Sequence, residues 1–192
     1  MTNARRIAGP QAKNRAVLLD AAERLLLTEG YAAVTSRRVA AEAGLKPQLV
    51  HYYFATMDEL YLTVFRRRAE EGLARQAAAL ASDEPLRALW VFSLDDAGTA
   101  LTSEFVALAN HRKEIRSEIA RYAERFRAMQ VTALAGILES AGVDPSAFPP
   151  GAVSVFLTSL SRVVIMERTL GLTAGHEDAV AVAERFIEQL DR

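Results

Sequence analysis

The segment from Thr35 to Phe54, TSRRVAAEAGLKPQLVHYYF, has the pattern of two short helices joined by a tight turn. The hydroxyl of Thr35 can cap the first helix, because the N–H groups of a first turn have no partner within the helix. Gly44 is expected to end that helix, since glycine enters the left-handed region without a steric penalty. Pro47 suits the first position of a second helix, where its missing N–H costs nothing. The segment therefore predicts a helix-turn-helix.

The second helix of such a motif lies in the major groove of DNA, so its outward side chains are candidate DNA contacts. Leu45, Val50 and Phe54 have the spacing of an inward face, and packing is an alternative role for the rings of His51, Tyr52 and Tyr53. The amide of Gln48 can pair with adenine, and Lys46 can pair with guanine or a phosphate. The predicted DNA-contacting residues are Thr35, Arg37, Lys46, Pro47, Gln48, Leu49, His51, Tyr52 and Tyr53.

Further residues on both sides of this segment complete an ordered pattern. They are Val17, Leu18, Ala21, Ala22, Leu25 and Leu26 before Gly30-Tyr31, then Val34-Thr35, Arg37, Val39-Ala40, Ala43-Gly44, Tyr53-Phe54, Asp58 and Leu60. Over residues 13–62 this set resembles the DNA-binding domain of TetR-family transcriptional regulators. The resemblance implies an all-α fold of about nine helices. It would consist of an N-terminal three-helix head with the helix-turn-helix and a C-terminal helical body that binds a ligand and dimerises.

Three residues depart from the family pattern at expected contact positions. His51 stands where these proteins usually carry a phosphate-contacting tyrosine, and Met57 replaces a lysine that often touches the DNA backbone. Arg38 stands where an acidic residue commonly completes the cap of the second helix. One phosphate donor is therefore lost at Met57, and one cation is gained at Arg38. Contact with DNA and simple exposure to solvent are both open for Arg38.

Net charge is unevenly distributed along the chain. Residues 1–54 carry eight Lys and Arg against four acidic residues, whereas the remainder carries fifteen against twenty. This asymmetry places the attraction for phosphate in the head. We expect a DNA-binding domain over residues 1–55, of which residues 1–12 form a flexible basic arm, and an effector-binding and dimerisation domain over residues 56–192.

Composition favours an ordinary globular protein. The 192 residues are 51% hydrophobic and contain no cysteine, which is consistent with a reducing cytoplasm and with the absence of disulfides. No run of about eighteen apolar residues occurs, so we expect no membrane span. We find no nucleophile elbow, phosphate-binding glycine loop or metal-ligand spacing, and therefore expect no enzymatic activity, cofactor or metal.

Helical spacing continues beyond the head. Thr56 and Glu59 have the spacing of a capping box that opens a long helix toward Leu80. Three consecutive arginines, residues 66–68, lie on that helix and are expected to form a solvated face. The last two helices are apolar over so much of their circumference that a second protein surface is needed to cover them. The predicted dimer interface consists of Phe156, Leu160, Val163, Val164, Val182, Phe186 and Leu190. A monomer that buries both faces itself is the alternative.

The family resemblance also implies a small-molecule pocket among the middle helices. By position we expect it to be lined by Trp90, Phe105, Asn110, Tyr122, Phe126, Met129, Phe156 and Met166, with Glu104 and His111 as further polar anchors. Ordinary core packing is the alternative for each aromatic residue and methionine. The resulting hypothesis is a dimeric, sequence-specific repressor that a small apolar or aromatic effector releases from a palindromic operator. A helix-turn-helix activator, or a DNA-binding protein without an effector, is the alternative.

Overall fold

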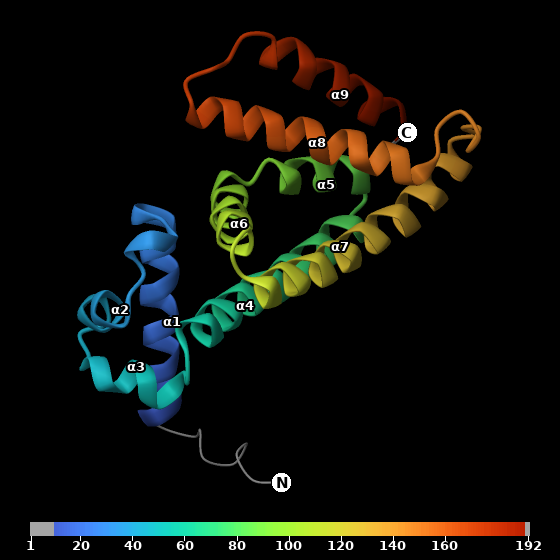
Figure 1. The fold of residues 1–192 in the computed structure, drawn as a ribbon. Helices are drawn as coiled ribbons and strands as arrows, with labels where there is room; N and C mark the ends of the chain where they lie inside the picture. Colours follow the sequence, from blue (N-terminus) through green and yellow to red (C-terminus); the bar gives the residue numbers. More distant parts are fainter. Residues whose placement is uncertain (1–9, 191–192) are drawn as a thin grey trace, which may run out of the picture. The chain divides into compact units, whose positions relative to one another are not determined.

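The structure is a computed structural model that describes residues 10–190, and in this range its regular elements are all helical (Figure 1). The elements are α1 (Pro10–Glu29), the 3₁₀ turn η2 (Tyr31–Ala33), α2 (Ser36–Glu42), α3 (Pro47–Tyr53), α4 (Met57–Leu80), α5 (Pro85–Ser93), α6 (Asp96–Ala109), α7 (Lys113–Ser140), α8 (Pro150–Thr169) and α9 (His176–Leu190). The predicted all-α fold with an N-terminal helix-turn-helix is confirmed. The predicted basic arm falls mostly outside the described residues.

Two compact units make up the described chain. Unit 1 comprises the residues up to Arg68 together with Leu101–Ile119, and unit 2 comprises Ala69–Ala100 and the residues from Ala120 onward. Helices α4, α6 and α7 each contribute a segment to both units. This division by packing differs from a boundary after residue 55, because the first half of α4 shares its core with the helices of the head. The boundary of the DNA-binding domain itself stays a prediction.

The core of unit 1 is apolar and brings α1 together with the first half of α4. Leu18 and Leu60 are fully buried, and Leu25 and Val64 are nearly so. Phe65 and Phe105 pack edge to face, with ring centroids 5.2 Å apart, a favourable geometry for an aromatic pair. Burial of these side chains fixes the helix-turn-helix on a rigid support.

The three arginines of α4 are not the solvated face that we expected. Arg67 lies between Asp20 and Glu23 of α1, at 2.6 and 2.8 Å from their carboxylate oxygens. Arg68 also approaches Glu23, at 3.3 Å, and Arg66 donates to Glu118 of α7 at 2.5 Å. Hydrogen bonds to both carboxylates more than offset burial and raise the pKa of Arg67. These arginines therefore tie the helices of unit 1 together.

The core of unit 2 is assembled from α5, α7, α8 and α9. Its buried cluster consists of Leu86, Trp90, Leu134, Leu138, Val153, Ala183 and Ile187. Helix α8 supplies only part of its apolar surface to this core, since Phe156, Met166 and Leu170 stay exposed. By length and composition α8 could also cross a membrane. An apolar helix that packs against protein passes the same test, and α8 carries Arg162 at its middle.

Candidate functional site

The turn between α2 and α3 has the geometry that the sequence predicts. The hydroxyl of Thr35 accepts a hydrogen bond from the N–H of Arg38 at 3.3 Å and so caps α2. Gly44 adopts a positive φ of 65°. The N–H of Leu45 then donates to the carbonyl of Ala40 at 2.9 Å, and that of Gly44 to Ala41 at 3.1 Å. This pair of bonds is the Schellman closure of a helix end, and it sets the direction in which α3 begins.

Helix α3 begins at Pro47 and is anchored by its inward face. Lys46, just before it, has an extended backbone with ψ at 140°. Val50 and Phe54 are almost completely buried, as predicted. The guanidinium of Arg15 on α1 lies over the ring of Phe54, 5.2 Å from its centroid. The opposite face of α3 is thereby held outward.

The predicted DNA-contacting residues lie together on α2, the turn and α3 of unit 1. Exposed to solvent are Thr35, Arg37, Lys46, Pro47, Gln48, His51 and Tyr52, while Leu49 and Tyr53 are half-buried. Tyr52 has 65% of its surface exposed, and its ring packs edge to face on that of Tyr53 with centroids 5.0 Å apart. This contact gives the half-buried Tyr53 a packing role. We call the seven exposed residues the α3 surface.

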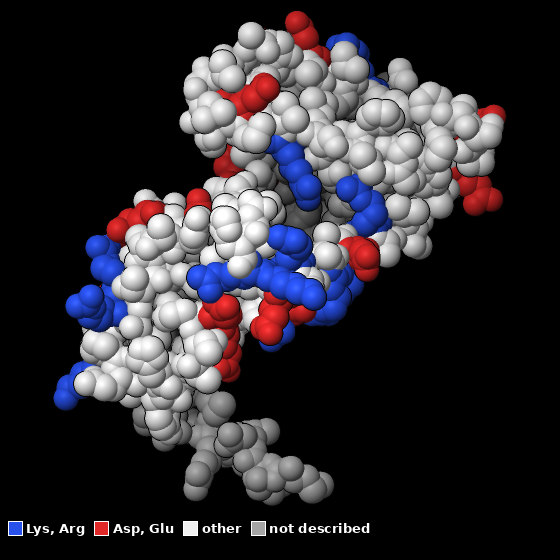
Figure 2. All heavy atoms as spheres, viewed as in Figure 1, with Lys and Arg blue, Asp and Glu red and all other residues white. Residues whose placement is uncertain are grey.

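The acidic residues of the head form ion pairs with arginines that lie outside the α3 surface. All four acidic residues of the head are engaged by arginines: Asp20 and Glu23 by Arg67, Glu29 by Arg38 and Glu42 by Arg24. The guanidinium of Arg38 pairs with Glu29 and is still half exposed, so contact with DNA stays one of its two possible roles. Within residues 10–190, Lys46 and Arg37 have no carboxylate in ion-pair distance, so both are available to phosphates. Figure 2 shows lysine and arginine side chains interleaved with acidic ones on one face.

A second set of contacts holds the link between α1 and α2. Gly30 has φ 78° and ψ 171°, a backbone conformation open essentially to glycine alone. The N–H of Tyr31 donates to Glu104 of α6 at 2.8 Å. The hydroxyl of Tyr61 donates to the carbonyls of Val34 at 3.0 Å and Tyr31 at 3.2 Å. Burial raises the pKa of Tyr61, so its hydroxyl stays protonated and remains a donor.

The start of α4 shows a variant of the predicted capping box. The N–H of Glu59 donates to the hydroxyl of Thr56 at 3.1 Å. The carboxylate of Glu59 reaches back to the N–H of Ala55 at 2.7 Å, one residue before the cap. Both ends of the helix-turn-helix are therefore closed by local side-chain bonds.

The residues predicted to line a pocket are distributed over both units. Phe105 and Asn110 belong to unit 1, and the other six belong to unit 2. Trp90, Phe105 and Tyr122 are buried, and Phe126 and Met129 are half-buried, whereas Phe156 and Met166 are exposed. Phe105 has a full packing role against Phe65.

Of the three predicted polar anchors, one has its side chain engaged by another element. The carboxylate of Glu104 is occupied by the N–H of Tyr31. His111 and Asn110 lie exposed in the turn after α6, and the carbonyl of Asn110 accepts a bond from Arg116 at 3.1 Å. Sequence periodicity could not reveal these partners, because each lies on another element.

Most of the predicted interface residues have their side chains at the surface of unit 2. Phe156, Val163 and Val182 are exposed, and Leu160, Phe186 and Leu190 are half-buried. Val164 is the exception: with 1% of its surface exposed it belongs to the core of its own unit, and it has no surface left for a partner.

Three exposed apolar side chains of α8 and Leu170, the residue that follows its last turn, form one stripe. Phe156, Val163, Met166 and Leu170 follow one another at steps of seven, three and four residues, which places them on one face of the helix. Phe156 is 74% exposed and Leu170 is 71% exposed. We call these four residues the α8 stripe.

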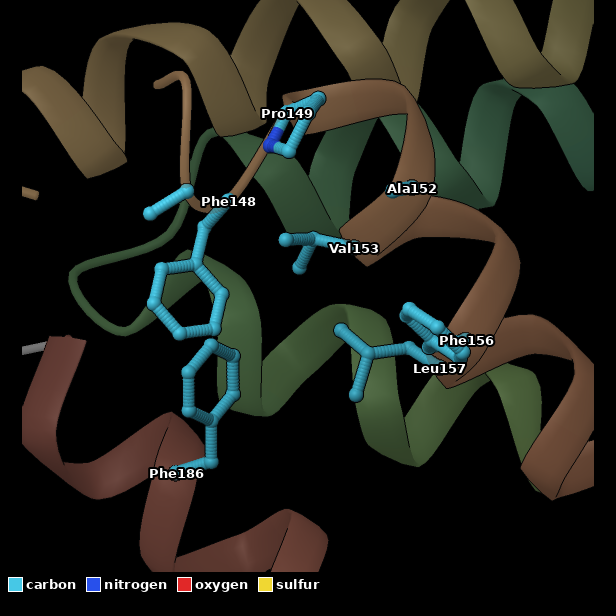
Figure 3. A pocket seen from close by; sticks show the side chains of 8 residues that line it. Phe148, Pro149, Ala152, Val153, Phe156, Leu157 and Phe186 are labelled. Carbon is cyan, nitrogen blue, oxygen red and sulfur yellow. The ribbon is translucent and has the colours of Figure 1, made fainter. Parts of the chain in front are cut away.

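A shallow apolar hollow of about 210 Å³ lies beside the stripe (Figure 3). Its lining consists of Ala147, Phe148, Pro149, Ala152, Val153, Phe156, Leu157 and Phe186. The rings of Phe148 and Phe186 lie next to each other in this lining, tilted by 38° with centroids 6.2 Å apart. The loop before α8, helix α8 itself and helix α9 thus form one apolar surface.

Polar side chains inside unit 2 were missed by the sequence analysis. Gln76 of α4, Gln130 of α7 and Ser154 of α8 are buried and bonded to one another. Arg127 of α7 donates to Ser154 and to Thr158. A periodic pattern assigns such residues to a solvated face, and only their spacing of three residues on α7 (127 and 130) and four on α8 (154 and 158) could have indicated a shared polar face.

Comparisons with known proteins give one family. Residues 18–64 match the model described as bacterial regulatory proteins, tetR family. This segment contains α2, α3 and the first part of α4, together with most of α1. It therefore includes the whole α3 surface.

Relatives extend the similarity into the remainder of the chain. The HTH-type transcriptional regulator BetI of Rhizobium meliloti is 29% identical over 128 residues, which are 62% of this chain and 63% of the relative. A structure of a TetR-family member from Streptomyces coelicolor A3 has a TM-score of 0.64 and 27% identity, covering 90% of this chain and 97% of that one. A transcriptional regulator from Saccharomonospora viridis in complex with choline has a TM-score of 0.76 at 21% identity, covering 93% and 97%, and shows the shared fold.

Proposed function

Because this chain belongs to the TetR family of DNA-binding transcriptional regulators, we propose that it is a cytoplasmic homodimer that binds a palindromic operator and releases it when a small molecule binds. The family resemblance drawn from residues 13–62 is confirmed by the match over residues 18–64. The palindromic operator, the dimerisation and the response to an effector are the parts of the proposal that we add to the family assignment.

The observation that carries the proposal is the α3 surface. It combines a base-reading amide at Gln48, unpaired cations at Lys46 and Arg37, and hydroxyl or imidazole donors at Tyr52 and His51. Phosphate contacts fix the register of a protein on DNA, and base-edge contacts supply the sequence preference. A helix of seven residues that begins with proline presents its first turn to the groove, as helix-turn-helix proteins do.

Selection from random duplex DNA tests this proposal directly. We expect the recovered fragments to contain an inverted repeat whose half-sites are about one DNA turn, roughly 34–36 Å, apart. Fluorescence anisotropy with the recovered duplex should fall strongly for Lys46→Ala and stay unchanged for Lys113→Ala, an exposed lysine at the start of α7. Equal loss for both variants, or no binding by the wild-type protein in dilute salt, would contradict the proposal.

Dimerisation through α8 and α9 is proposed from the α8 stripe. Exposed apolar side chains in one continuous row are rare on monomers and typical of subunit interfaces. A two-fold axis through this surface would pair each stripe with its copy and leave one α3 surface on each subunit. A palindromic operator then follows from the symmetry.

A small-molecule response is proposed from unit 2. The indole N–H of Trp90 is buried without an acceptor among the described residues, which supports a place for Trp90 in a ligand site. Thermal-shift screening followed by anisotropy would identify compounds that stabilise the protein and release DNA. Choline, present in one structural neighbour, belongs in that screen. Stabilising compounds that leave DNA affinity unchanged would favour an effector-independent regulator.

A further inference from the structure

Unit 2 encloses a chain of neutral polar side chains that are joined by hydrogen bonds. Gln76 is fully buried and donates to the carbonyl of Phe126 at 3.0 Å. Gln130 donates to the Gln76 amide oxygen at 2.8 Å, and the hydroxyl of Ser154 donates to the Gln130 amide oxygen at 2.6 Å. Burial of polar groups is tolerated when each is bonded in this way. The chain links α4, α7 and α8 and needs no charge to complete it.

Arg127 adds a charge at one end of this chain. One terminal nitrogen of its guanidinium donates to Ser154 at 2.6 Å, and the other donates to Thr158 at 3.2 Å. Both hydroxyls donate their own hydrogen bond elsewhere. Ser154 donates to the amide oxygen of Gln130, and Thr158 donates to the carbonyl of Ser154 at 2.8 Å. Without Arg127, therefore, neither hydroxyl would lose the acceptor of its hydrogen bond. The hydrogen bonds of the chain do not by themselves explain why a cation is half-buried here.

The charge of Arg127 is not balanced by an acidic residue. Among residues 10–190 no carboxylate lies in ion-pair distance of Arg127 or of Arg162, which follows Thr158 by one turn of α8. The half-buried Arg67 of unit 1, in contrast, has two carboxylates. Burial, and secondly the charge of Arg162, lower the pKa of Arg127. The guanidinium of Arg127 thus stands beside neutral hydroxyls, with a second arginine as a neighbouring charge.

We propose that Arg127 and Arg162 bind the carboxylate of a small organic acid, with Ser154 and Thr158 holding the guanidinium of Arg127 in position. Ser154 and Thr158 each take one N–H of a terminal nitrogen of Arg127, and its Nε–H with a second terminal N–H can form two parallel hydrogen bonds to a carboxylate. A single negative charge loses less hydration on entering a half-buried site than a phosphate dianion does. A cationic ligand such as choline meets repulsion here. This inference rests on the proposed effector response and names the chemical class of the effector.

Paired acids and amides test the inference on the full-length protein. Isothermal titration should detect binding of benzoate or octanoate, while benzamide, octanamide, choline and inorganic phosphate bind at least about tenfold more weakly. Arg127→Gln should lower the affinity for the bound acid by about tenfold or more, and Arg162→Gln should lower it by a smaller factor. Arg185→Gln, which removes an exposed arginine of α9, is the matched control and should leave the affinity unchanged.

Folding of the variants is monitored by thermal melting without ligand. Arg127→Gln should melt close to the wild-type temperature, because the hydroxyls keep their partners, and Arg127→Lys keeps the charge but loses the fork. Amides that bind as well as acids, binding of phosphate alone, no binding by either acid, or an unaffected Arg127→Gln would each overturn the inference. DNA affinity without ligand is measured on the same preparations, so a failure of the DNA-binding proposal is seen separately.

Discussion

Units 1 and 2 place their polar and apolar side chains in opposite ways. Unit 1 has an apolar interior, and arginines at its surface are paired with carboxylates of neighbouring helices. Unit 2 buries two glutamines and two serines and partly buries an arginine, while it exposes the α8 stripe. Sequences usually depart from the apolar-in, polar-out rule where function requires it. This contrast is the basis for proposing a ligand site inside unit 2 and a subunit interface on its surface.

The two units also differ in how their function depends on the backbone. The α3 surface of unit 1 is ordinary in composition and gains its role from the closed turn and from the glycines that permit it. The candidate sites of unit 2 depend on side-chain chemistry on regular helices. Backbone substitutions should therefore affect unit 1 most, and changes of charge should affect unit 2 most.

The largest effect is expected from a charge in the α8 stripe. Met166→Glu would place an unpaired carboxylate in the proposed subunit interface, where its burial costs about 3–5 kcal/mol. Sedimentation equilibrium should show a dimer for the wild-type protein and a monomer for the variant, and affinity for a palindromic duplex should fall accordingly.

Val91→Glu provides the control for that substitution. Val91 is 64% exposed on α5 of the same unit, outside the α8 stripe. Its replacement should leave the dimer intact. A wild-type monomer at micromolar concentration, or equal dissociation of both variants, would remove α8 from the interface.

The next effect concerns the backbone of unit 1. Gly30→Ala forces a side chain into the conformation at φ 78° and ψ 171° and brings its Cβ within 3.2 Å of the Glu104 carboxylate. We expect a loss of about 2–3 kcal/mol in unfolding free energy. In Gly44→Ala, at φ 65°, the new Cβ meets no atom within 4 Å, so we expect a smaller loss of about 1 kcal/mol in unfolding free energy. Urea denaturation of both variants measures the difference, and equal losses would mean that the Glu104 contact and the backbone of Gly30 add nothing.

Local signals explain which parts of the structure the sequence could predict. The cap at Thr35, the turn at Gly44 and the helix start at Pro47 depend on neighbouring backbone groups, and all three are found in the structure. Helical periodicity likewise identified the long helices. These features need no knowledge of distant residues.

Partners on other elements explain what the sequence could not predict. The arginines at 66–68 look like a solvated run, because their partners Asp20, Glu23 and Glu118 are between 44 and 52 positions away in the sequence, farther than any helical repeat. Val164 has the same spacing as its exposed neighbours, and only packing shows that it belongs to the core. The polar chain through Gln130 escaped notice for the same reason.

A smaller and more selective effect is expected at the α3 surface. Gln48→Ala should lose about 1–3 kcal/mol of discrimination at one base pair, because the amide reads a base edge. Lys46→Ala should weaken binding to all duplexes alike and lower the salt dependence, as expected for a phosphate contact. Anisotropy with the selected duplex and single-base variants separates the two patterns. Uniform loss for both would show that Gln48 is not the base reader.

The smallest effect is expected from an exposed pair in unit 2. Hydrogen bonds from Arg125 and from the Tyr122 hydroxyl hold the pKa of Glu70 at about 2, below its ordinary value of 4.5. Because the folded pKa is the lower one, the pair contributes stability that is complete above pH 4.5 and is lost as the pH falls toward 2. Glu70→Gln should therefore flatten the decline of the urea midpoint over this range, whereas Glu124→Gln, at an exposed position of α7, should not. A wild-type decline in both variants would place the acid sensitivity elsewhere in the protein.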